Sequence, residues 1–269
     1  RASLGEPNGI VLVTGPTGSG KTTTLYAGMS ILNNAEQKLF TVEDPIEYHL
    51  DGINQIQVSP RIGLGFSAAL RSILRQDPDI VMIGEIRDLE TAEIAVQASL
   101  TGHLVLSTVH TNSAVATVTR LIDMGIERYL LASSLSGVLA QRLVRRLCPH
   151  CAVPHEMADS LIERLAAEAC PGGRNGDGLL AWSGAPMRLL RPVGCGACRS
   201  TGFSGRTVIA EFLGMTAGIR DGIVRGAPEQ EIEQAARANG MIGMYRDGLI
   251  RALRGETTVE EVLQVTRMR

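Results

Sequence analysis

Residues 15–22 carry the side chains with the clearest chemistry in this 269-residue chain. They read Gly-Pro-Thr-Gly-Ser-Gly-Lys-Thr, which fits the phosphate-binding pattern G-x-x-x-x-G-K-[ST]. In such a loop, backbone N–H groups surround phosphate oxygens at a helix N-terminus, the lysine reaches the β- and γ-phosphates, and the hydroxyl holds Mg²⁺. The candidate nucleotide-binding residues here are Gly15, Thr17, Gly18, Ser19, Gly20, Lys21, Thr22 and Thr23, and Thr22 is also the candidate magnesium ligand.

The choice of lysine at position 21 supports this interpretation. Of the 26 lysines and arginines, only Lys21 and Lys38 are lysines. An ammonium is a compact point charge that fits among phosphate oxygens, whereas a guanidinium is a broad planar fork. The alternative is a glycine-rich turn without a ligand. The apolar run before the loop and the helical pattern after it favour the nucleotide site.

Acidic residues follow two further apolar runs. Glu85 ends one of them and is expected to hold Mg²⁺ or its water. Glu43, Asp44 and Glu47 follow another, and one of them is expected to orient or deprotonate an attacking water. Each acid alone could be a solvated loop carboxylate, but their shared position at strand ends beside a phosphate loop favours function. Which acid is the general base stays open.

Two histidines flank a fourth apolar run. His110 follows it within a polar cluster that also holds Thr108, Thr111 and Asn112, which suits a sensor of the γ-phosphate. The alternative is a structural histidine that makes its hydrogen bonds inside the core. For His103, at the other end of the run, neither interpretation is favoured.

Two C-x-x-C pairs indicate a metal site. They are Cys148/Cys151 and Cys195/Cys198, separated by 43 residues. Four thiolates in two such pairs suit a closed, tetrahedral, structural Zn²⁺ site in a cytosolic protein. Four reduced thiols are the alternative, and His150 or His155 could replace a ligand. The fifth cysteine, Cys170, has no predicted role.

Strand and helix patterns alternate in the first half of the chain. Strands are expected at 9–14, 38–43, 79–84 and 103–107, helices at 22–33, 66–75, 89–100, 114–124 and about 128–147, and a loop or hairpin at 45–65. Such alternation predicts an α/β fold with a mainly parallel sheet covered by helices on both faces. Ligands of these sheets bind at the carboxyl ends of the strands, where the loops described above converge.

The composition changes after Leu147. We expect a nucleotide-binding core at 1–147, a tetracysteine module at 148–206, and a C-terminal subdomain at 207–269 that is a strand followed by helices. Thr257 or Thr258 is expected to cap the last helix. The first residues show neither a signal peptide nor an initiator Met, so we expect a fragment that lacks an N-terminal part.

The bulk composition limits the partners. The net charge is −2 and only 3% of residues are aromatic, so neither nucleic acid nor an anionic membrane is expected as a partner. The small cluster Arg142, Arg145 and Arg146 is interpreted as a solvated helix face. No apolar stretch approaches the roughly 18–20 residues that span a bilayer.

Five segments in order resemble the secretion and pilus traffic ATPases. They are Gly-Pro-Thr-Gly-Ser-Gly-Lys-Thr-Thr-Thr-Leu-Tyr, Glu-Asp-Pro-Ile-Glu at 43–47, Leu-Arg-Ser-Ile-Leu-Arg-Gln-Asp-Pro-Asp at 70–79, Gly-Glu-Ile-Arg-Asp at 84–88, and Thr-Gly-His to Thr-Asn at 101–112. The resemblance covers residues 9–269. The four cysteines are similar to a module of the secretion and pilus-assembly branch, which the pilus-retraction branch lacks.

The resemblance implies a RecA-like motor that hydrolyses ATP with Mg²⁺ and carries structural Zn²⁺. It would work as a homo-hexamer on the cytoplasmic face of a bacterial inner membrane, with a platform protein and other assembly proteins of that membrane as partners. The residues that match the family boxes are Lys21 and Thr22 (phosphate loop), Glu43, Asp44 and Glu47 (aspartate box), Glu85 (second nucleotide motif), His103 and His110 (histidine box), Arg71 and Arg75 (phosphate-sensing arginines), and the four paired cysteines.

Family members also carry an N-terminal domain that supplies arginines to the neighbour's ATP, and we expect this chain to lack that domain. An arginine finger is worth about 10³–10⁵ in rate, so we expect ATP binding with slow hydrolysis. Two other functions are alternatives: a zinc-ribbon translocase of nucleic acid, and a non-catalytic scaffold gated by nucleotide. The choice between secretion and pilus systems stays open.

Overall fold

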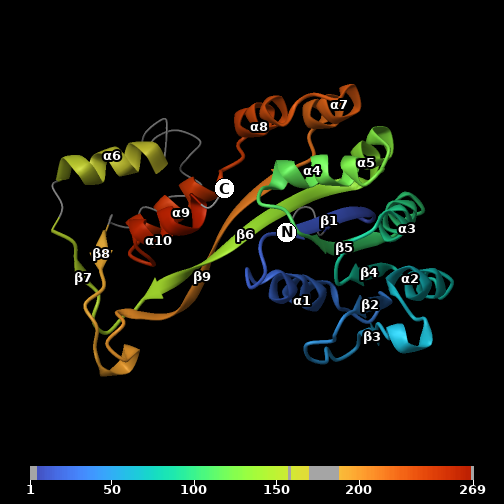
Figure 1. The fold of residues 1–269 in the computed structure, drawn as a ribbon, viewed down its shortest axis with the longest axis horizontal. Coiled ribbons are helices and arrows are strands. Elements are labelled where there is room, and N and C mark those ends of the chain that lie inside the picture. The colour runs from blue at the N-terminus through green and yellow to red at the C-terminus, as the bar shows by residue number, and fades with distance from the viewer. Residues whose placement is uncertain (1–4, 157–158, 170–187, 268–269) are drawn as a thin grey trace. The chain divides into compact units, whose positions relative to one another are not determined.

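The computed structural model describes residues 5–156, 159–169 and 188–267 (Figure 1). It forms two compact units, which we call the first unit (Arg1–Ala140 with Phe212–Met241) and the second unit (Gln141–Glu211 with Ile242–Arg269). The chain passes between them three times: inside strand β6 (Leu135–Leu147), inside strand β9 (Phe203–Gly214), and directly after Met241. The expected domain limits after residues 147 and 206 are therefore a different division, because composition marks the cysteine segments rather than the point at which packing changes.

The first unit contains a largely parallel sheet with the strand order β3-β2-β4-β5-β1-β6-β9. Its remaining elements are β1 (Gly9–Thr14), α1 (Lys21–Leu32), β2 (Leu39–Glu43), β3 (Asn54–Gln57), a 3₁₀ turn (Pro60–Ile62), α2 (Phe66–Leu74), β4 (Ile80–Ile83), α3 (Leu89–Leu100), β5 (Leu104–Val109), α4 (Ala114–Asp123), α5 (Arg128–Ser134), α7 (Ala217–Arg225) and α8 (Glu229–Ala238). The expected mainly parallel α/β fold is confirmed.

The register of the parallel strands places their carboxyl ends at one edge of the sheet. Strand β5 pairs with β1 from Gly9↔Leu104 to Thr14↔Val109, and with β4 up to Ile83↔Ser107. Strand β2 pairs with β4 up to Val42↔Ile83. The loops that leave β1, β2, β4 and β5 therefore start side by side, as ligand sites of such sheets require.

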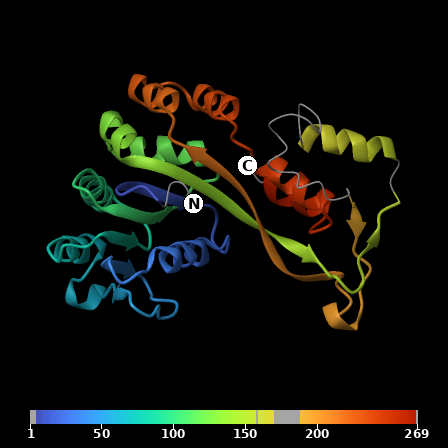
Figure 2. The ribbon, with the colours of Figure 1, turned by 180° about the vertical axis from the view of Figure 1, so that it is seen from behind.

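Helices cover both faces of this sheet. The connection through α1 runs from β1 past β5 and β4 to β2, whereas the connection through α3 runs back from β4 to β5. Because such crossovers are right-handed, opposite directions place α1 and α3 on opposite faces (Figures 1 and 2). On the α1 side, a hydrophobic core joins Leu25, Tyr26 and Met29 to buried side chains of four strands, which holds α1 against the sheet.

One expectation about secondary structure is wrong. The helix expected over 128–147 ends at Ser134, and residues 135–147 form β6, whose first half pairs in parallel with β1. Tertiary pairing overrides a local pattern that also fits a helix. The cluster of Arg142, Arg145 and Arg146 accordingly lies on a strand. Of residues 45–65, expected as a loop or hairpin, 54–57 form β3, which pairs in parallel with β2, and an antiparallel bridge joins Ser59 to Leu64.

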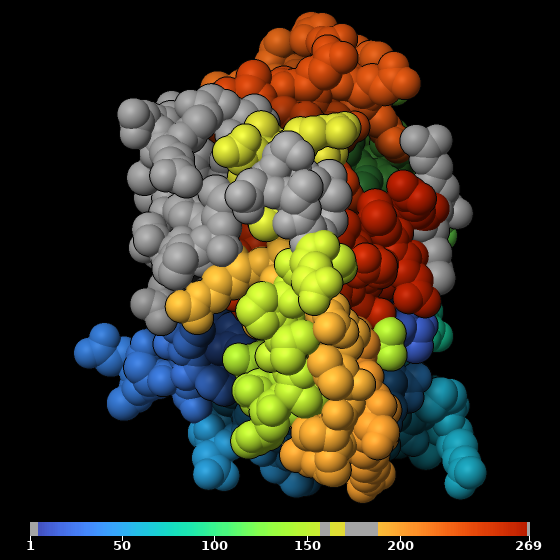
Figure 3. Space-filling view, turned by 90° about the vertical axis from the view of Figure 1, so that its left-hand side faces the viewer, coloured from blue at the N-terminus to red at the C-terminus, as the bar shows by residue number. Residues whose placement is uncertain are grey.

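The second unit holds the cysteine segments and a small helical core. Its own elements are β7 (Val153–Pro154), α6 (Asp159–Ala169), β8 (Leu190–Arg191), a 3₁₀ turn (Gly196–Cys198), α9 (Met244–Leu253) and α10 (Val259–Thr266). Helix α9 packs against α6 and α10, and Thr258 caps α10 through Glu261 N–H, 3.3 Å away. In Figure 3, the segment around 145–156 (yellow-green) lies beside the segment around 190–206 (orange) at the surface.

No helix in the described ranges has the length and apolar character needed to cross a membrane.

Candidate functional site

The phosphate loop connects the buried strand β1 to the N-terminus of α1. The helix starts at Lys21, and the residue before it, Gly20, has φ 87°, while Gly18 has φ 76°. Residues with a side chain rarely adopt this left-handed conformation, so glycine is needed at both positions. The turn exposes the first backbone N–H groups of α1, which is the arrangement that binds anions at helix N-termini.

Lys21 lies across the loop that precedes it. Its Nζ donates hydrogen bonds to the carbonyl oxygens of Gly15, at 2.9 Å, and of Pro16, at 3.2 Å. Burial lowers the pKa of Lys21, and the negative charge of Glu85 partly offsets this effect. The ammonium is therefore held in a confined, partly desolvated place with an acid nearby, where phosphate oxygens would be strong partners.

Glu85 follows β4 and is largely buried. Its Oε2 lies 2.6 Å from Nε of Arg87 and 3.5 Å from Nε2 of His110. The residue before it, Gly84, donates its N–H to Val42 O at 2.8 Å, and a Cβ at Gly84 would lie only 3.2 Å from that oxygen. Glycine thus lets the end of β4 approach β2 closely. This close approach fixes the position of the Glu85 backbone.

Hydroxyl groups at the end of β5 hold His110 near Glu85. Ser107 Oγ donates to Ile83 O at 2.8 Å, and Thr108 Oγ1 donates to Gly84 O at 2.7 Å. These bonds add to the strand pairing and join the last residues of β5 to the turn that carries Glu85. The expected closeness of the two strand-end segments is what the structure shows.

A second set of hydroxyls joins the His110 segment to the phosphate loop. Thr14, the last residue of β1, places its Oγ1 2.7 Å from Thr111 Oγ1 and 2.9 Å from Thr111 N. Thr111 Oγ1 in turn lies 2.6 Å from Thr117 Oγ1 on α4. The loop that begins at Gly15, the His110 segment and α4 are therefore connected through Thr111.

The acids after β2 fall into two groups. Asp44 and Glu47 are exposed, whereas Glu43 is only 2% exposed. Glu43 Oε1 accepts hydrogen bonds from Thr41 Oγ1 at 2.5 Å and Gln55 Nε2 at 3.0 Å, and its Oε2 accepts one from the Tyr26 hydroxyl. Burial, together with the hydrogen bond to Glu43, raises the pKa of Tyr26 to about 12.

A cavity of about 610 Å³ opens where these loops meet. The expected site residues that line it are Thr17, Gly18, Gly20, Lys21, Thr22, Thr23, Glu43, Asp44, Glu47, Glu85 and His110. Gly15 and Ser19 belong to the same loop. The volume is in the range of small-molecule and cofactor sites. The lining combines the Lys21 ammonium and the start of α1 with the carboxylates of the acids after β2 and β4.

Three expected residues lie apart from this cavity. His103 precedes β5, at the opposite end of that strand from His110, and its Nδ1 lies 2.8 Å from Ala98 O. Arg71, on α2, pairs with Glu90 at 2.7 Å, and both are exposed. Arg75 follows the same helix and donates to Ser72 Oγ at 3.3 Å.

Several residues of the site are not among those predicted from the sequence. Arg87, Tyr48 and Phe66 also line the cavity, and Tyr26 and Gln55 hold Glu43. Arg87 could have been found, because it stands two residues after Glu85 at the same strand end. Tyr26 could have been suspected from helical spacing, since it stands three residues before Met29 on the buried face of α1.

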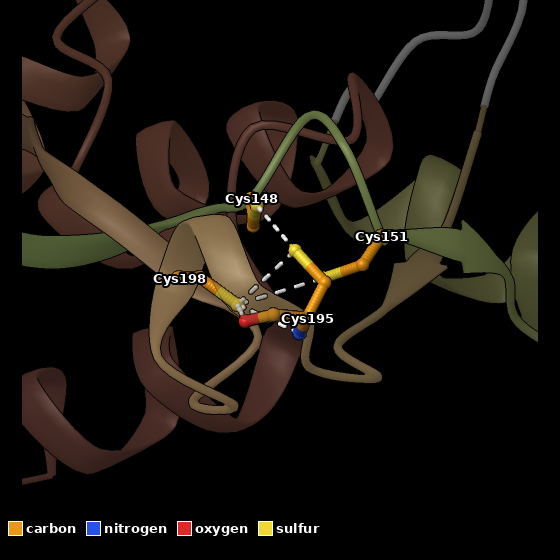
Figure 4. Close-up of side chains that lie close together, drawn as sticks. All are labelled: Cys148, Cys151, Cys195 and Cys198. Carbon is orange, nitrogen blue, oxygen red and sulfur yellow. Dashed lines mark hydrogen bonds between the residues drawn. The ribbon is translucent and has the colours of Figure 1, made fainter.

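The four paired cysteines come together in the second unit (Figure 4). Their ligand atoms all lie within 4.8 Å of one another. Sγ–Sγ distances are 3.9 Å for Cys148–Cys195, 3.8 Å for Cys151–Cys198 and 3.8 Å for Cys195–Cys198. Four sulfurs placed tetrahedrally at about 2.3 Å from one zinc ion would be about 3.8 Å apart. The donor set therefore fits Zn²⁺ in both chemistry and spacing.

Backbone N–H groups surround this cluster. Cys198 Sγ lies 3.2 Å from the backbone nitrogens of Cys195 and Gly202, and Cys151 Sγ lies 3.3 Å from that of Gly194. Burial raises the pKa of Cys198, but the N–H groups and neighbouring thiols outweigh it and lower the pKa to about 6. A thiolate is thus favoured at one corner of the cluster. Cys170 lies outside the described residues.

The known proteins that resemble this chain belong to secretion and pilus systems. A family described as type II/IV secretion system protein matches residues 1–264. The chain is 55% identical over 267 residues to the type II secretion system protein E of Xanthomonas campestris (99% of this chain, 45% of that protein) and 48% identical over 263 residues to the type IV pilus assembly ATPase PilB of Myxococcus xanthus (98% and 44%). It is 52% identical over 267 residues to the type II secretion system ATPase E of Vibrio cholerae (99% and 50%).

The chain spans about half the length of these curated relatives. Among solved structures, the pilus retraction motor PilT with bound ADP matches with a TM-score of 0.70 and 29% identity, over 98% of this chain and 63% of that one. The ATPase DotB of Legionella pneumophila, at 23% identity and a TM-score of 0.68, shares the fold. These findings confirm the resemblance: the chain belongs to the type II/IV secretion system protein family.

Proposed function

We propose that this chain is the ATP-hydrolysing region of a motor that drives type II secretion or pilus assembly. The observation that carries the proposal is the cavity that joins the phosphate loop to Glu85, Asp44, Glu47 and His110. The names of its relatives support the same conclusion, since they include a secretion ATPase and a pilus assembly ATPase. PilT, with ADP bound, supports the nucleotide as ligand.

Different residues of the cavity would bind different parts of the nucleotide and its Mg²⁺. The N–H groups at the start of α1 and the ammonium of Lys21 would hold phosphate oxygens. Thr22 and Glu85 would hold Mg²⁺, which neutralises charge on the β- and γ-phosphates when it is bound. His110 lies 3.5 Å from Glu85 and would report on occupancy of the γ-phosphate position.

The exposed acids are the groups that can meet water in this cavity. Asp44 and Glu47 are exposed at its wall, whereas both oxygens of Glu43 accept hydrogen bonds from buried side chains. A general base must reach the proton that it removes. We therefore assign water positioning to Asp44, Glu47 and Glu85, and assign Glu43 to holding the loop that carries the first two.

The motor would act as a ring of copies on a membrane-bound assembly machine. The resemblance implies a homo-hexamer with inner-membrane platform and assembly proteins as partners, in which a site is completed by the neighbouring copy. Arg71 and Arg75 are consistent with such a role, since both are exposed and lie outside the cavity of their own chain. The rate of ATP hydrolysis per chain should then depend on how many copies have assembled into the ring.

The tetracysteine cluster would hold one structural Zn²⁺. Its spacing matches four thiolates around one ion, which leaves no position for a substrate. The ion would hold the two cysteine segments of the second unit together. It would take no part in the chemistry of the first unit.

The test is hydrolysis of Mg²⁺-ATP per chain at rising protein concentration, with Lys21→Ala as the control. We expect specific activity to increase with concentration and to vanish in the variant, because phosphate binding needs the ammonium. Hydrolysis that Lys21→Ala leaves intact would exclude this site. Tight ATP binding without turnover at any concentration would mean that hydrolysis needs groups from outside this chain, or that ATP serves only as a switch.

A further inference from the structure

Tyr26 joins the phosphate-loop helix to the acidic loop, by which we mean residues 44–49. It lies in the second turn of α1, and its side chain is fully buried. Its hydroxyl donates to Oε2 of Glu43 and accepts the backbone N–H of Glu47 at 3.3 Å. One buried oxygen thus binds the last residue of β2 and the middle of the acidic loop at once.

The ring of Tyr26 makes a second contact with the same loop. Its centroid lies 4.6 Å from that of Tyr48, with an interplanar angle of 79°. Edge-to-face pairs of this kind add to the energy of burial. The hydroxyl and the ring therefore contact the adjacent residues Glu47 and Tyr48, and the acidic loop has two fixed points on α1.

Gln55, on β3, holds the far side of the loop. Its Nε2 lies 3.0 Å from Glu43 Oε1 and 3.2 Å from Tyr48 O, and its Oε1 accepts Leu50 N–H at 2.7 Å. The loop is thus held from α1 and from β3, with Glu43 between the two. Of these two anchors, only Tyr26 belongs to the helix that starts with Lys21 and Thr22.

We propose that Tyr26 is a positioning residue for ATP hydrolysis: its hydroxyl sets the acidic carboxylates of the loop at a fixed place relative to the phosphate loop. This inference rests on the proposed function. Misplacing a catalytic group by about 1 Å can cost about 100-fold in rate, so a hydroxyl that fixes this distance matters even though it touches no nucleotide.

The test compares Tyr26→Phe with Thr41→Val. Each variant removes one buried hydroxyl that donates to Glu43, and each keeps the size of the side chain. Only Tyr26 also contacts the acidic loop. Three measurements are needed on both variants and on the wild type: kcat and KM for Mg²⁺-ATP, the thermal midpoint of unfolding, and hydrogen exchange of peptides that cover residues 44–50.

We expect both variants to lower the thermal midpoint, because each leaves a buried carboxylate oxygen with one donor fewer. Only Tyr26→Phe should lower kcat, by at least about fivefold with little change in KM, since the phosphate-binding groups stay in place. Only Tyr26→Phe should speed exchange in the acidic loop.

Equal losses of kcat in both variants would overturn the inference, because the effect would then follow stability alone. Unchanged kcat and exchange in Tyr26→Phe would overturn it as well. A wild type that binds ATP without hydrolysing it would count against the proposed function instead, since exchange still decides whether Tyr26 holds the loop.

Discussion

The guanidinium Nε of Arg87 lies 2.6 Å from Oε2 of Glu85, so the acid at the end of β4 is paired with a cation from its own turn. The Arg87 side chain is 69% exposed and the Glu85 side chain only 12% exposed. An exposed partner can leave at small cost, whereas the carboxylate stays in place. Glu85 is therefore a fixed acid with a removable cation, as a ligand for Mg²⁺ or its water should be.

Replacing Glu85 by glutamine should abolish catalysis without abolishing binding. We expect Glu85→Gln to lower the rate of hydrolysis by at least about 100-fold, since it removes a carboxylate from the reacting centre and keeps its shape. Affinity for ADP should change by less than about threefold, because the phosphate loop is intact. The measurements are single-turnover hydrolysis and binding of a fluorescent ADP.

The matched control is Glu233→Gln. Glu233 is also an acid paired with an arginine, Arg237, at 2.7 Å, but this pair is exposed on α8. The control should keep the wild-type rate. A Glu85→Gln protein that hydrolyses ATP within about threefold of the wild type would remove Glu85 from the catalytic centre.

Much of the first unit followed from the sequence because its boundaries carry local signals. The predicted limits of β1 and α3 agree with the structure at both ends. Glycines stand at both ends of β1. Asp88 caps α3 by accepting a hydrogen bond from Thr91 N–H at 2.8 Å. Strand β6 was missed because its partner, β1, lies more than a hundred residues away, and no local pattern encodes that pairing.

The site was predictable at the level of strand ends and less so at the level of single contacts. Placing Lys21, Glu85 and His110 together needs only the rule that carboxyl ends of parallel strands meet. The burial of Glu43 depends on Tyr26 and Gln55, from two other elements. Sequence alone could not distinguish this buried acid from its exposed neighbour Asp44.

The pKa of Lys21 predicts a pH dependence of stability. Burial lowers it below the usual value of 10.5, so just below that pH the unfolded chain binds more protons than the folded one. Stability contributed at this position therefore rises as the pH increases toward 10.5. We expect the thermal midpoint of the wild type, relative to Lys21→Met, to be higher at about pH 10 than at about pH 7.5.

Lys38→Met provides the comparison, since Lys38 is the other lysine and is exposed. The difference in thermal midpoint between Lys38→Met and the wild type should change less over the same pH interval. If the two variants follow the same pH curve, Lys21 is not desolvated in the folded chain.

Metal analysis should find about one zinc per chain, because four thiolates complete one tetrahedral site. Cys195→Ser should lose most of that zinc and lower the thermal stability of the second unit. Nucleotide affinity should be retained, since the phosphate loop and its acids belong to the first unit. The measurements are elemental analysis of reduced protein, thermal unfolding and ADP binding.

Cys170→Ser is the control for this experiment, because Cys170 stands outside the two C-x-x-C pairs. It should keep the metal and the stability of the wild type. Freshly purified, reduced wild-type protein without zinc would refute the assignment, and so would equal zinc in Cys195→Ser.

Thr111 should contribute to stability through its hydroxyl. Its Oγ1 lies between the hydroxyls of Thr14 and Thr117, at 2.7 and 2.6 Å, in a partly buried place. Thr111→Val keeps the shape and removes both contacts, so we expect a loss of about 1–3 kcal/mol in the free energy of unfolding. Thr111→Ser keeps the hydroxyl and should recover most of the loss. Urea unfolding monitored by circular dichroism measures both.

The contrast is Thr101→Val, which removes an exposed hydroxyl that bonds to Gln97 O and Ala98 O, each at 3.0 Å. Water can replace that hydroxyl, so the variant should stay within about 0.5 kcal/mol of the wild type. If Thr111→Val costs no more than Thr101→Val, the Thr111 hydroxyl does not tie the His110 segment to the phosphate loop. A loss that serine does not recover would assign the effect to the methyl group instead.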